Sequence, residues 1–200
     1  MKKADVRIPA ETPARLAQFI TLMTGLVEEH AGDEAALLKK AGPALKHLVS
    51  RDDWLDDSFA VPDPDIYRQY LIYCDPLSRF SIVSFVWEPG QQTPIHDHMV
   101  WGLVGVLRGS EQNETFTITD SGPVSTGSQI AETGSVAIVS PTLGDVHRVS
   151  NVSAATAISI HVYGADIGTV KRHVFQPDGT VKEFISGYSK PTPLGFQGKS

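Results

Sequence analysis

The stretch that decides the fold is Gly90–Gly109, which reads GQQTPIHDHMVWGLVGVLRG. Its two histidines, His96 and His98, are one residue apart, and Gly102 follows them. Alternate side chains of a β-strand point to the same face, so a strand here would project both imidazoles to one side. Two imidazoles on one face are two-thirds of a three-histidine metal site, which needs a third ligand and a cavity from elsewhere in the chain.

Composition bounds the class of protein. The chain has 200 residues, 41% hydrophobic and 20% charged, with a net charge of −6. This suits one ordinary globular domain and argues against nucleic acid or an anionic membrane as the main partner. The single cysteine, Cys74, cannot form an internal disulfide. With no secretory signal visible and no run approaching about 20 apolar residues, we expect a cytoplasmic protein without a membrane span.

The first third of the chain, residues 1–65, has the periodicity of helices that pack on a larger body. Residues 12–29 predict an amphipathic helix, with Thr12 as its cap and Pro13 at the first helical position. Asp33 caps a predicted second, short helix, and residues 41–49 add a further turn or two after Gly42-Pro43. Residues 51–57 and 61–65 predict loops or short helical turns. His30 and His47 are interpreted as surface or capping residues.

Residues 66–185 are β-rich and end before a polar tail at 186–200, which we expect to wrap the surface. Close spacing of short strands predicts a sandwich or barrel, with the helices too small to form a second domain. Pro177-Asp178-Gly179 predicts the turn of a hairpin. The predicted strands are 70–74, 80–87, 101–107, 114–118, 135–139, 146–150, 157–163, 170–175 and 180–184.

Two spaced motifs give the histidines a context. The spacing Gly90-x5-His96-x-His98-x3-Gly102-x6-Gly109 resembles the first cupin motif, and Gly134 followed by Pro141-x2-Gly144-x2-His147-x3-Asn151 resembles the second. Their joint occurrence implies a mainly β, single-domain cupin: a small antiparallel barrel with the N-terminal helices outside. The resemblance also implies that His96, His98 and His147 are metal ligands. His173 is interpreted as an exposed strand histidine.

Gly102 stands where cupins normally carry an acidic ligand. Three neutral imidazoles leave a divalent ion its full charge and several open positions, which favours an anionic ligand such as a thiolate. A zinc site of three histidines and water would instead suit hydrolysis. Affinity rules alone leave iron, zinc, nickel and manganese open.

A polar strand completes the pattern. Ser159, His161 and Tyr163 alternate in the sequence SIHVY, so they share one face and predict a hydrogen-bond relay; polar packing inside the barrel is the alternative. With the three-histidine site, this strand resembles the cysteine dioxygenase type I family of thiol dioxygenases, from about Tyr67 to Arg172. The resemblance implies one Fe(II) per chain, O₂ and a small thiol carboxylate as partners, and Ser159, His161 and Tyr163 as catalytic residues.

Two departures from the animal enzymes refine the resemblance. Gly102 replaces their crosslinking cysteine, which leaves Tyr163 an unmodified phenol. Gln69 occupies their carboxylate-binding arginine position, which resembles the Gln-type bacterial branch close to 3-mercaptopropionate dioxygenases. In that branch Arg172 matches the arginine that binds the carboxylate, beside Gln69; a solvent-facing strand arginine is the alternative. Arg68 is interpreted as a surface residue.

The predicted function is therefore oxidation of a small thiol carboxylic acid, 3-mercaptopropionate or L-cysteine, to its sulfinic acid. Cysteine dioxygenase activity proper and a metal-binding cupin sensor without turnover are the alternatives. A hydrolytic or isomerising zinc or manganese cupin is disfavoured, because such sites usually keep the glutamate.

Overall fold

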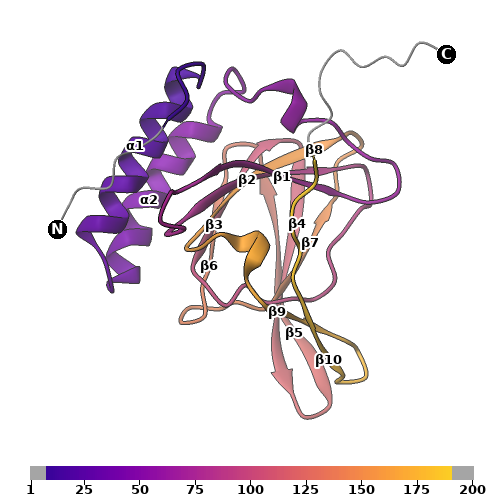
Figure 1. Ribbon diagram of the computed structural model, residues 1–200. Helices are drawn as coiled ribbons and strands as arrows, with labels where there is room; N and C mark the ends of the chain where they lie inside the picture. Colours follow the sequence, from indigo (N-terminus) through magenta and orange to yellow (C-terminus); the bar gives the residue numbers. More distant parts are fainter. Residues whose placement is uncertain (1–7, 191–200) are drawn as a thin grey trace.

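The computed structural model describes residues 8–190. Two helices lie side by side and cover one face of a body built from antiparallel strands (Figure 1). The expected class, mainly β with N-terminal helices packed outside, is confirmed. None of the helices within residues 8–190 combines the length and apolar character that a membrane crossing requires.

The first helix, α1, spans Ala14–Glu29, and the second, α2, spans Glu34–Val49. Two local predictions were wrong here. Pro13, not Thr12, precedes the first helical residue and no side chain caps it. The second helix also continues through Pro43, because its apolar stripe is buried on both sides of the proline and packing outweighs the lost backbone hydrogen bond. Asp33 caps α2 as expected, accepting from the Ala36 N–H at 3.0 Å.

Within residues 8–190, ten strands follow the helices, with short 3-10 helices at Asp57–Phe59 and Ile167–Thr169. One sheet has the order β1-β2-β8-β3-β6, a second has the order β5-β4-β7, and β9 and β10 form the hairpin predicted around Pro177-Asp178-Gly179. The strands are β1 (Arg68–Cys74), β2 (Ser81–Trp87), β3 (Gly102–Arg108), β4 (Ser110–Thr119), β5 (Gly122–Glu132), β6 (Val136–Val139), β7 (His147–Asn151), β8 (Ala157–Tyr163), β9 (Arg172–Phe175) and β10 (Val181–Phe184).

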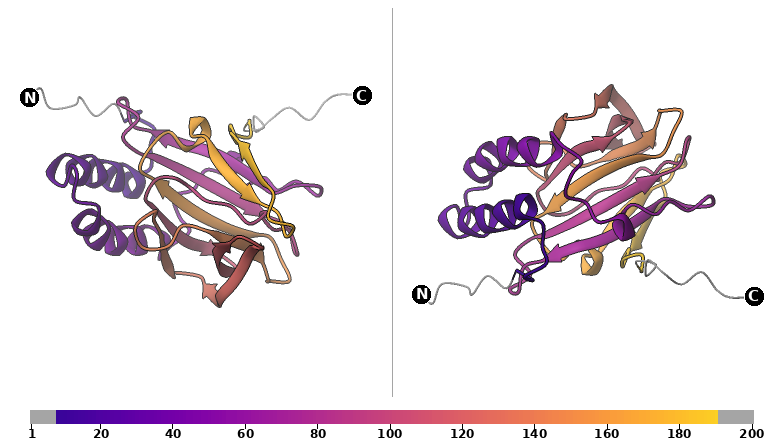
Figure 2. Two further views of the ribbon diagram at one scale, coloured as in Figure 1. Left: turned by 90° about the horizontal axis from the view of Figure 1, so that it is seen from below. Right: turned by 90° about the horizontal axis from the view of Figure 1, so that it is seen from above.

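Residues 91–97 join β7 to β9, although they form no regular strand. His96 exchanges backbone hydrogen bonds of 3.0 Å with His147 on one side, and Phe175 donates to Ile95 at 2.9 Å on the other. The predicted strand around the two histidines is therefore an extended segment held by isolated bridges. It closes the second layer of the barrel between the three-stranded sheet and the β9–β10 hairpin (Figure 2).

Every residue of β2 and β8 is buried, because each strand has a covered layer on both faces. On β8, Ile158, Ile160 and Val162 join the core beneath the helices. The alternate residues Ser159, His161 and Tyr163 point into the barrel. The apolar face of β8 packs beneath the helices, and the polar residues therefore lie on the face of β8 that is turned into the barrel.

The second sheet differs most from expectation. Strand β4 is longer than predicted, and β5, which was not predicted, pairs with it along its whole length. The sequence of β5, GPVSTGSQIAE, is rich in small polar residues and mostly exposed, so it lacks the apolar alternation of a half-buried strand. The tail was expected only to wrap the surface, yet residues 186–189 pack against β1, where Ser189 donates to the Gln69 carbonyl at 2.8 Å. The remainder of the tail, 191–200, lies outside the described residues.

Candidate metal centre and its cavity

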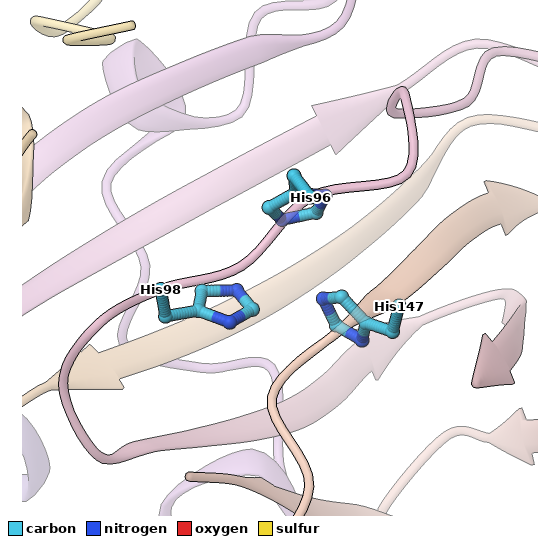
Figure 3. Close-up of side chains that lie close together, drawn as sticks. All are labelled: His96, His98 and His147. Carbon is cyan, nitrogen blue, oxygen red and sulfur yellow. The ribbon is translucent and has the colours of Figure 1, made fainter. Parts of the chain in front are cut away.

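His96, His98 and His147 meet inside the barrel. One ring nitrogen from each lies within 4.8 Å of the others, and the ring centroids are 4.8–4.9 Å apart. Figure 3 shows two rings on the extended segment and the third at the start of β7, all turned toward one space. All three side chains are buried.

Each imidazole has its Nδ1 engaged by an oxygen acceptor. His96 Nδ1 lies 3.0 Å from the Pro94 carbonyl, His98 Nδ1 lies 2.8 Å from Asp145 Oδ1, and His147 Nδ1 lies 2.7 Å from Asn113 Oδ1. These acceptors place the ring proton on Nδ1 and leave Nε2 as the free electron pair of each ring. This is the arrangement by which outer residues orient histidine ligands.

The donor set fits a divalent metal ion. Burial, followed by the neighbouring His98, lowers the pKa of His96 to about 3, and burial lowers the pKa of His147 well below its ordinary value. Both rings are therefore neutral, as metal ligation requires. His98 Nε2 is buried and has no hydrogen-bond partner within the described residues. An unpartnered donor atom among three convergent rings fits the role of a metal ligand.

Asp145 anchors the centre from outside. Its carboxylate accepts from His98 Nδ1 and from the backbone N–H groups of His98 and Met99, the latter two at 3.0 Å. Burial alone would raise the pKa of Asp145, but these hydrogen bonds and the His98 ring lower it overall. An ionised carboxylate therefore sits behind one ligand, where it makes the imidazole a stronger donor.

A cavity of about 330 Å³ opens beside the centre. Tyr67, Phe85 and Trp87 stack as one wall, with Tyr67 and Trp87 centroids 4.6 Å apart. The volume is at the lower end of the range for small-molecule sites. Residues that line the cavity are Tyr67, Gln69, Phe85, Trp87, Thr93, Pro94, His96, His147, Val149, His161, Tyr163, Arg172, Val174, Phe184 and Ser186.

The predicted contacts of the polar strand are present. Ser159 Oγ lies 2.8 Å from His161 Nε2, and His161 Nδ1 lies 2.7 Å from the Tyr163 hydroxyl. Tyr163 stacks on His98 with centroids 5.5 Å apart, which places the phenol beside the centre. Burial raises the pKa of Tyr163 and lowers that of His161 well below its ordinary value, so both are neutral. Three neutral groups in series can pass a proton by exchanging hydrogen bonds.

Arg172 presents a buried positive charge to the same cavity. The residue is 4% exposed, its Nη2 donates to Ser186 Oγ at 2.6 Å, and its guanidinium lies 4.7 Å from the centroid of the Phe184 ring. Its Nε is buried without a partner, and within residues 8–190 no carboxylate forms a salt bridge with it. Burial lowers the pKa of Arg172. A buried guanidinium without a counter-ion is a ready site for an anion.

Gln69 lines the cavity, but its amide N–H groups donate to the carbonyls of Ser186 and Gly187, at 3.4 and 3.1 Å. It therefore holds the segment that carries the partner of Arg172. Arg68 points away from the cavity and forms an ion pair with Asp63, partly exposed. The prediction that Arg68 faces outward is consistent with this placement.

The other histidines lie outside the three-histidine group. His30 caps the end of α1 and His47 is exposed. His173 was predicted to be exposed, but it is only partly so, with its Nδ1 2.7 Å from Asp97 Oδ2. Because Asp97 lies between His96 and His98 in the sequence, this contact ties β9 to the three-histidine group.

Several residues of the site were not predicted. Asp145 lies two residues before His147 in the second motif, so its position was a usable signal. Asn113 and Glu111 lie on β4, and nothing in their local sequence marks them as neighbours of the centre. Ser186 was assigned to a tail without a role.

Comparison with known proteins identifies the family. The family model described as "Cysteine dioxygenase type I" matches residues 8–175. The chain belongs to the cysteine dioxygenase type I family. As a member, it is a metal-dependent cupin of the dioxygenase type, with a small-molecule substrate and O₂.

The solved structures to which the chain is similar are distant in sequence. An uncharacterized conserved protein with a double-stranded β-helix domain from Klebsiella pneumoniae is 15% identical, with a TM-score of 0.47, over 70% of this chain and all of the other. An RmlC-like cupin protein from Desulfovibrio desulfuricans is 22% identical, with a TM-score of 0.41, over 56% of this chain and 94% of the other. A cupin 2 conserved barrel domain protein from Salinispora arenicola is 17% identical, with a TM-score of 0.42, over 58% of this chain and 89% of the other.

Proposed function

We propose that this protein is a mononuclear Fe(II) thiol dioxygenase that converts a small thiol carboxylic acid to its sulfinic acid with O₂. The observation that carries the proposal is the pairing of two features in one cavity. The three-histidine centre and the buried guanidinium of Arg172, which has no salt bridge within the described residues, line the same cavity. A thiol carboxylate has the two anionic ends that these features would bind.

His96, His98 and His147 would hold the ion through Nε2. Iron in this centre would supply open positions for a thiolate and O₂, together with the redox change by which both oxygen atoms reach sulfur. A ligand set of neutral imidazoles leaves the charge of the ion uncompensated, so an anionic thiolate is preferred to water. Family membership supports dioxygenation in place of zinc hydrolysis.

The chain's own residues position the substrate and control protons. Arg172 would pair with the carboxylate, with Nε and the Nη groups available for a bidentate contact. Gln69 would contribute indirectly, by holding Ser186 and Gly187 against Arg172. Tyr163 would donate a hydrogen bond at the reacting end, with His161 and Ser159 fixing its direction. The aromatic wall of Tyr67, Phe85 and Trp87 would exclude water.

We propose 3-mercaptopropionate as the preferred substrate over L-cysteine. Cysteine carries an ammonium group, and a buried ammonium needs an acceptor or an opposite charge. Among the residues that the structure describes, none that lines the cavity is a carboxylate, and Arg172, which supplies a positive charge there, would repel an ammonium. We also propose one Fe(II) per chain and a cytoplasmic setting.

Oxygen uptake tests the function. Protein loaded anaerobically with Fe(II) is expected to consume O₂ with 3-mercaptopropionate, and the product mass is expected to rise by two oxygen atoms. Comparing kcat/KM for the two thiols decides the substrate, and Gln69→Arg tests whether that position sets it. Metal analysis of the purified protein, before loading, checks the iron assignment. No O₂ consumption with either thiol would refute the proposal, and thiol binding without turnover would favour a sensor.

A further inference from the structure

We propose that Glu111 is the positioning residue at the inner end of the Ser159–His161–Tyr163 chain, where it holds or releases the proton that sets the direction of every hydrogen bond in that chain. The link to turnover rests on the proposed function, whereas the direction of the chain rests on the protein alone.

Glu111 is buried where a carboxylate is costly. The residue is 2% exposed, and its Oε1 has no hydrogen-bond partner within the described residues. It lies on β4, two residues before Asn113, so the two side chains share the inward face of the strand. A buried carboxyl with an unpartnered oxygen and no cation beside it is stabilised in the protonated form.

Among residues 8–190, the surroundings of Glu111 supply hydrogen-bonding groups and no charged side chain. Burial raises its pKa to about 7, while hydrogen bonding from Ser159 and from the Trp87 indole lowers it by less. Trp87 Nε1 donates to Ser159 Oγ at 3.3 Å, and both groups are close enough to Glu111 to lower its pKa, so the three side chains form one cluster. The titratable groups nearby are His161 and Tyr163 on β8 and His147, which faces the same small cavity from β7. Strands β3, β5 and β6 face Glu111 with apolar side chains.

Counting donors shows why the state of Glu111 matters. Trp87 can only donate, and Ser159 has one proton, while a neutral His161 has one donor and one acceptor nitrogen. If Glu111 is protonated, it donates to Ser159, Ser159 donates to His161 Nε2, and His161 Nδ1–H donates to the Tyr163 oxygen. The hydroxyl proton of Tyr163 is then free to point into the cavity.

Ionised Glu111 reverses each bond. Ser159 then donates to Glu111, His161 Nε2–H donates to Ser159, and the Tyr163 hydroxyl is consumed by His161 Nδ1. The two states differ by one proton. A substrate thiol that becomes a thiolate can give its proton to the Tyr163 oxygen. Each group then passes a proton to the next, from Tyr163 to His161, from His161 to Ser159 and from Ser159 to Glu111, so that Glu111 ends protonated. The same shift turns the Tyr163 hydroxyl toward the cavity.

Nitrogen NMR of histidine-labelled, full-length protein tests the proposal without turnover. In the metal-free and zinc-loaded forms, His161 is expected to carry its proton on Nδ1 at low pH and on Nε2 at high pH. In the metal-free form the midpoint of this change is expected near pH 7. The signals are assigned with a His161→Gln variant. Glu111→Gln is expected to abolish this pH dependence. Glu114→Gln, on the outward face of the same strand, is expected to retain it.

A His161 tautomer that stays constant from pH 6 to pH 8 in the parent protein would overturn the proposal, as would an unchanged titration in Glu111→Gln. In the iron-loaded enzyme, the limb of the kcat/KM profile that reports the Glu111 proton is expected to disappear in Glu111→Gln. A tautomer switch in protein that consumes no O₂ would refute the proposed function and leave the relay standing. O₂ consumption by a protein whose His161 tautomer does not change with pH would refute the relay and leave the proposed function standing.

Discussion

Replacing Glu111 with glutamine should change how the stability of the protein depends on pH. Burial raises the pKa of Glu111 from an ordinary value of 4.5 to about 7, so the folded state binds a proton more tightly than the unfolded chain does. Stability therefore falls as pH rises from 4.5 through 7, because the unfolded state ionises first. At 1.36 kcal/mol per pH unit, the full effect is about 3 kcal/mol. Roughly 2.5 kcal/mol of it falls between about pH 5 and pH 8.

Urea denaturation of the metal-free protein at these two pH values measures the effect. Other groups also titrate in this range, but they contribute equally to the parent protein and to Glu111→Gln. The difference in unfolding free energy between the two should therefore shift by about 2.5 kcal/mol in favour of the variant at the higher pH. A shift below about 1 kcal/mol would show that Glu111 is not a buried acid with a raised pKa. Glu114→Gln, which loses only a partly exposed ion pair, should show little change.

Three further substitutions test the site. Arg172→Met should lower kcat/KM for the thiol acid by at least about 30-fold, because the substrate carboxylate would lose its buried partner. Lys171→Met, at an exposed residue, should leave kcat/KM unchanged, and equal effects of the two substitutions would refute the assignment of the carboxylate to Arg172. Asp145→Asn should weaken metal binding by roughly 10- to 100-fold in chelator competition, against exposed Asp120→Asn as control; unchanged affinity would remove Asp145 from the support of His98. Gly102→Ala should destabilise the fold by roughly 1–3 kcal/mol in thermal unfolding, since its Cβ would lie 2.7 Å from Val139 and 3.0 Å from the Tyr163 ring. Gly25→Ala in α1 has open space around the added Cβ and should not destabilise the fold. A Gly102→Ala variant as stable as the parent would show that Tyr163 is not tightly held.

Local sequence was sufficient for the parts of the protein that depend on short-range periodicity. The alternation in SIHVY placed Ser159, His161 and Tyr163 on one face, and the structure has them in contact. Spacing in the two motifs brought His147 to His96 and His98. The apolar rhythm of α1 and the turn at Pro177-Asp178-Gly179 were likewise readable, because each depends on neighbours within a few residues.

Predictions failed where distant contacts outweighed local preference. Pro43 stays inside α2 because the buried residues on either side hold that helix against the sheet. Strand β5 has no apolar alternation of its own and exists because β4 offers a partner along its whole length. His96 and His98 do not lie on a regular strand, since the segment is shared between β7 and β9.

The sequence by itself predicted the three histidines that meet, the contacts of the Ser159–His161–Tyr163 strand and the family, because these patterns lie in two short motifs and one strand. Only the tertiary structure decided which oxygen lies behind each imidazole, that Arg172 is buried with no salt bridge to any described residue, and that Glu111 is buried near Ser159 and Trp87. Those facts come from strands and a tail far apart in the chain. Burial and hydrogen bonding between such segments set the charge and direction of polar groups, and neither quantity is a property of the local sequence.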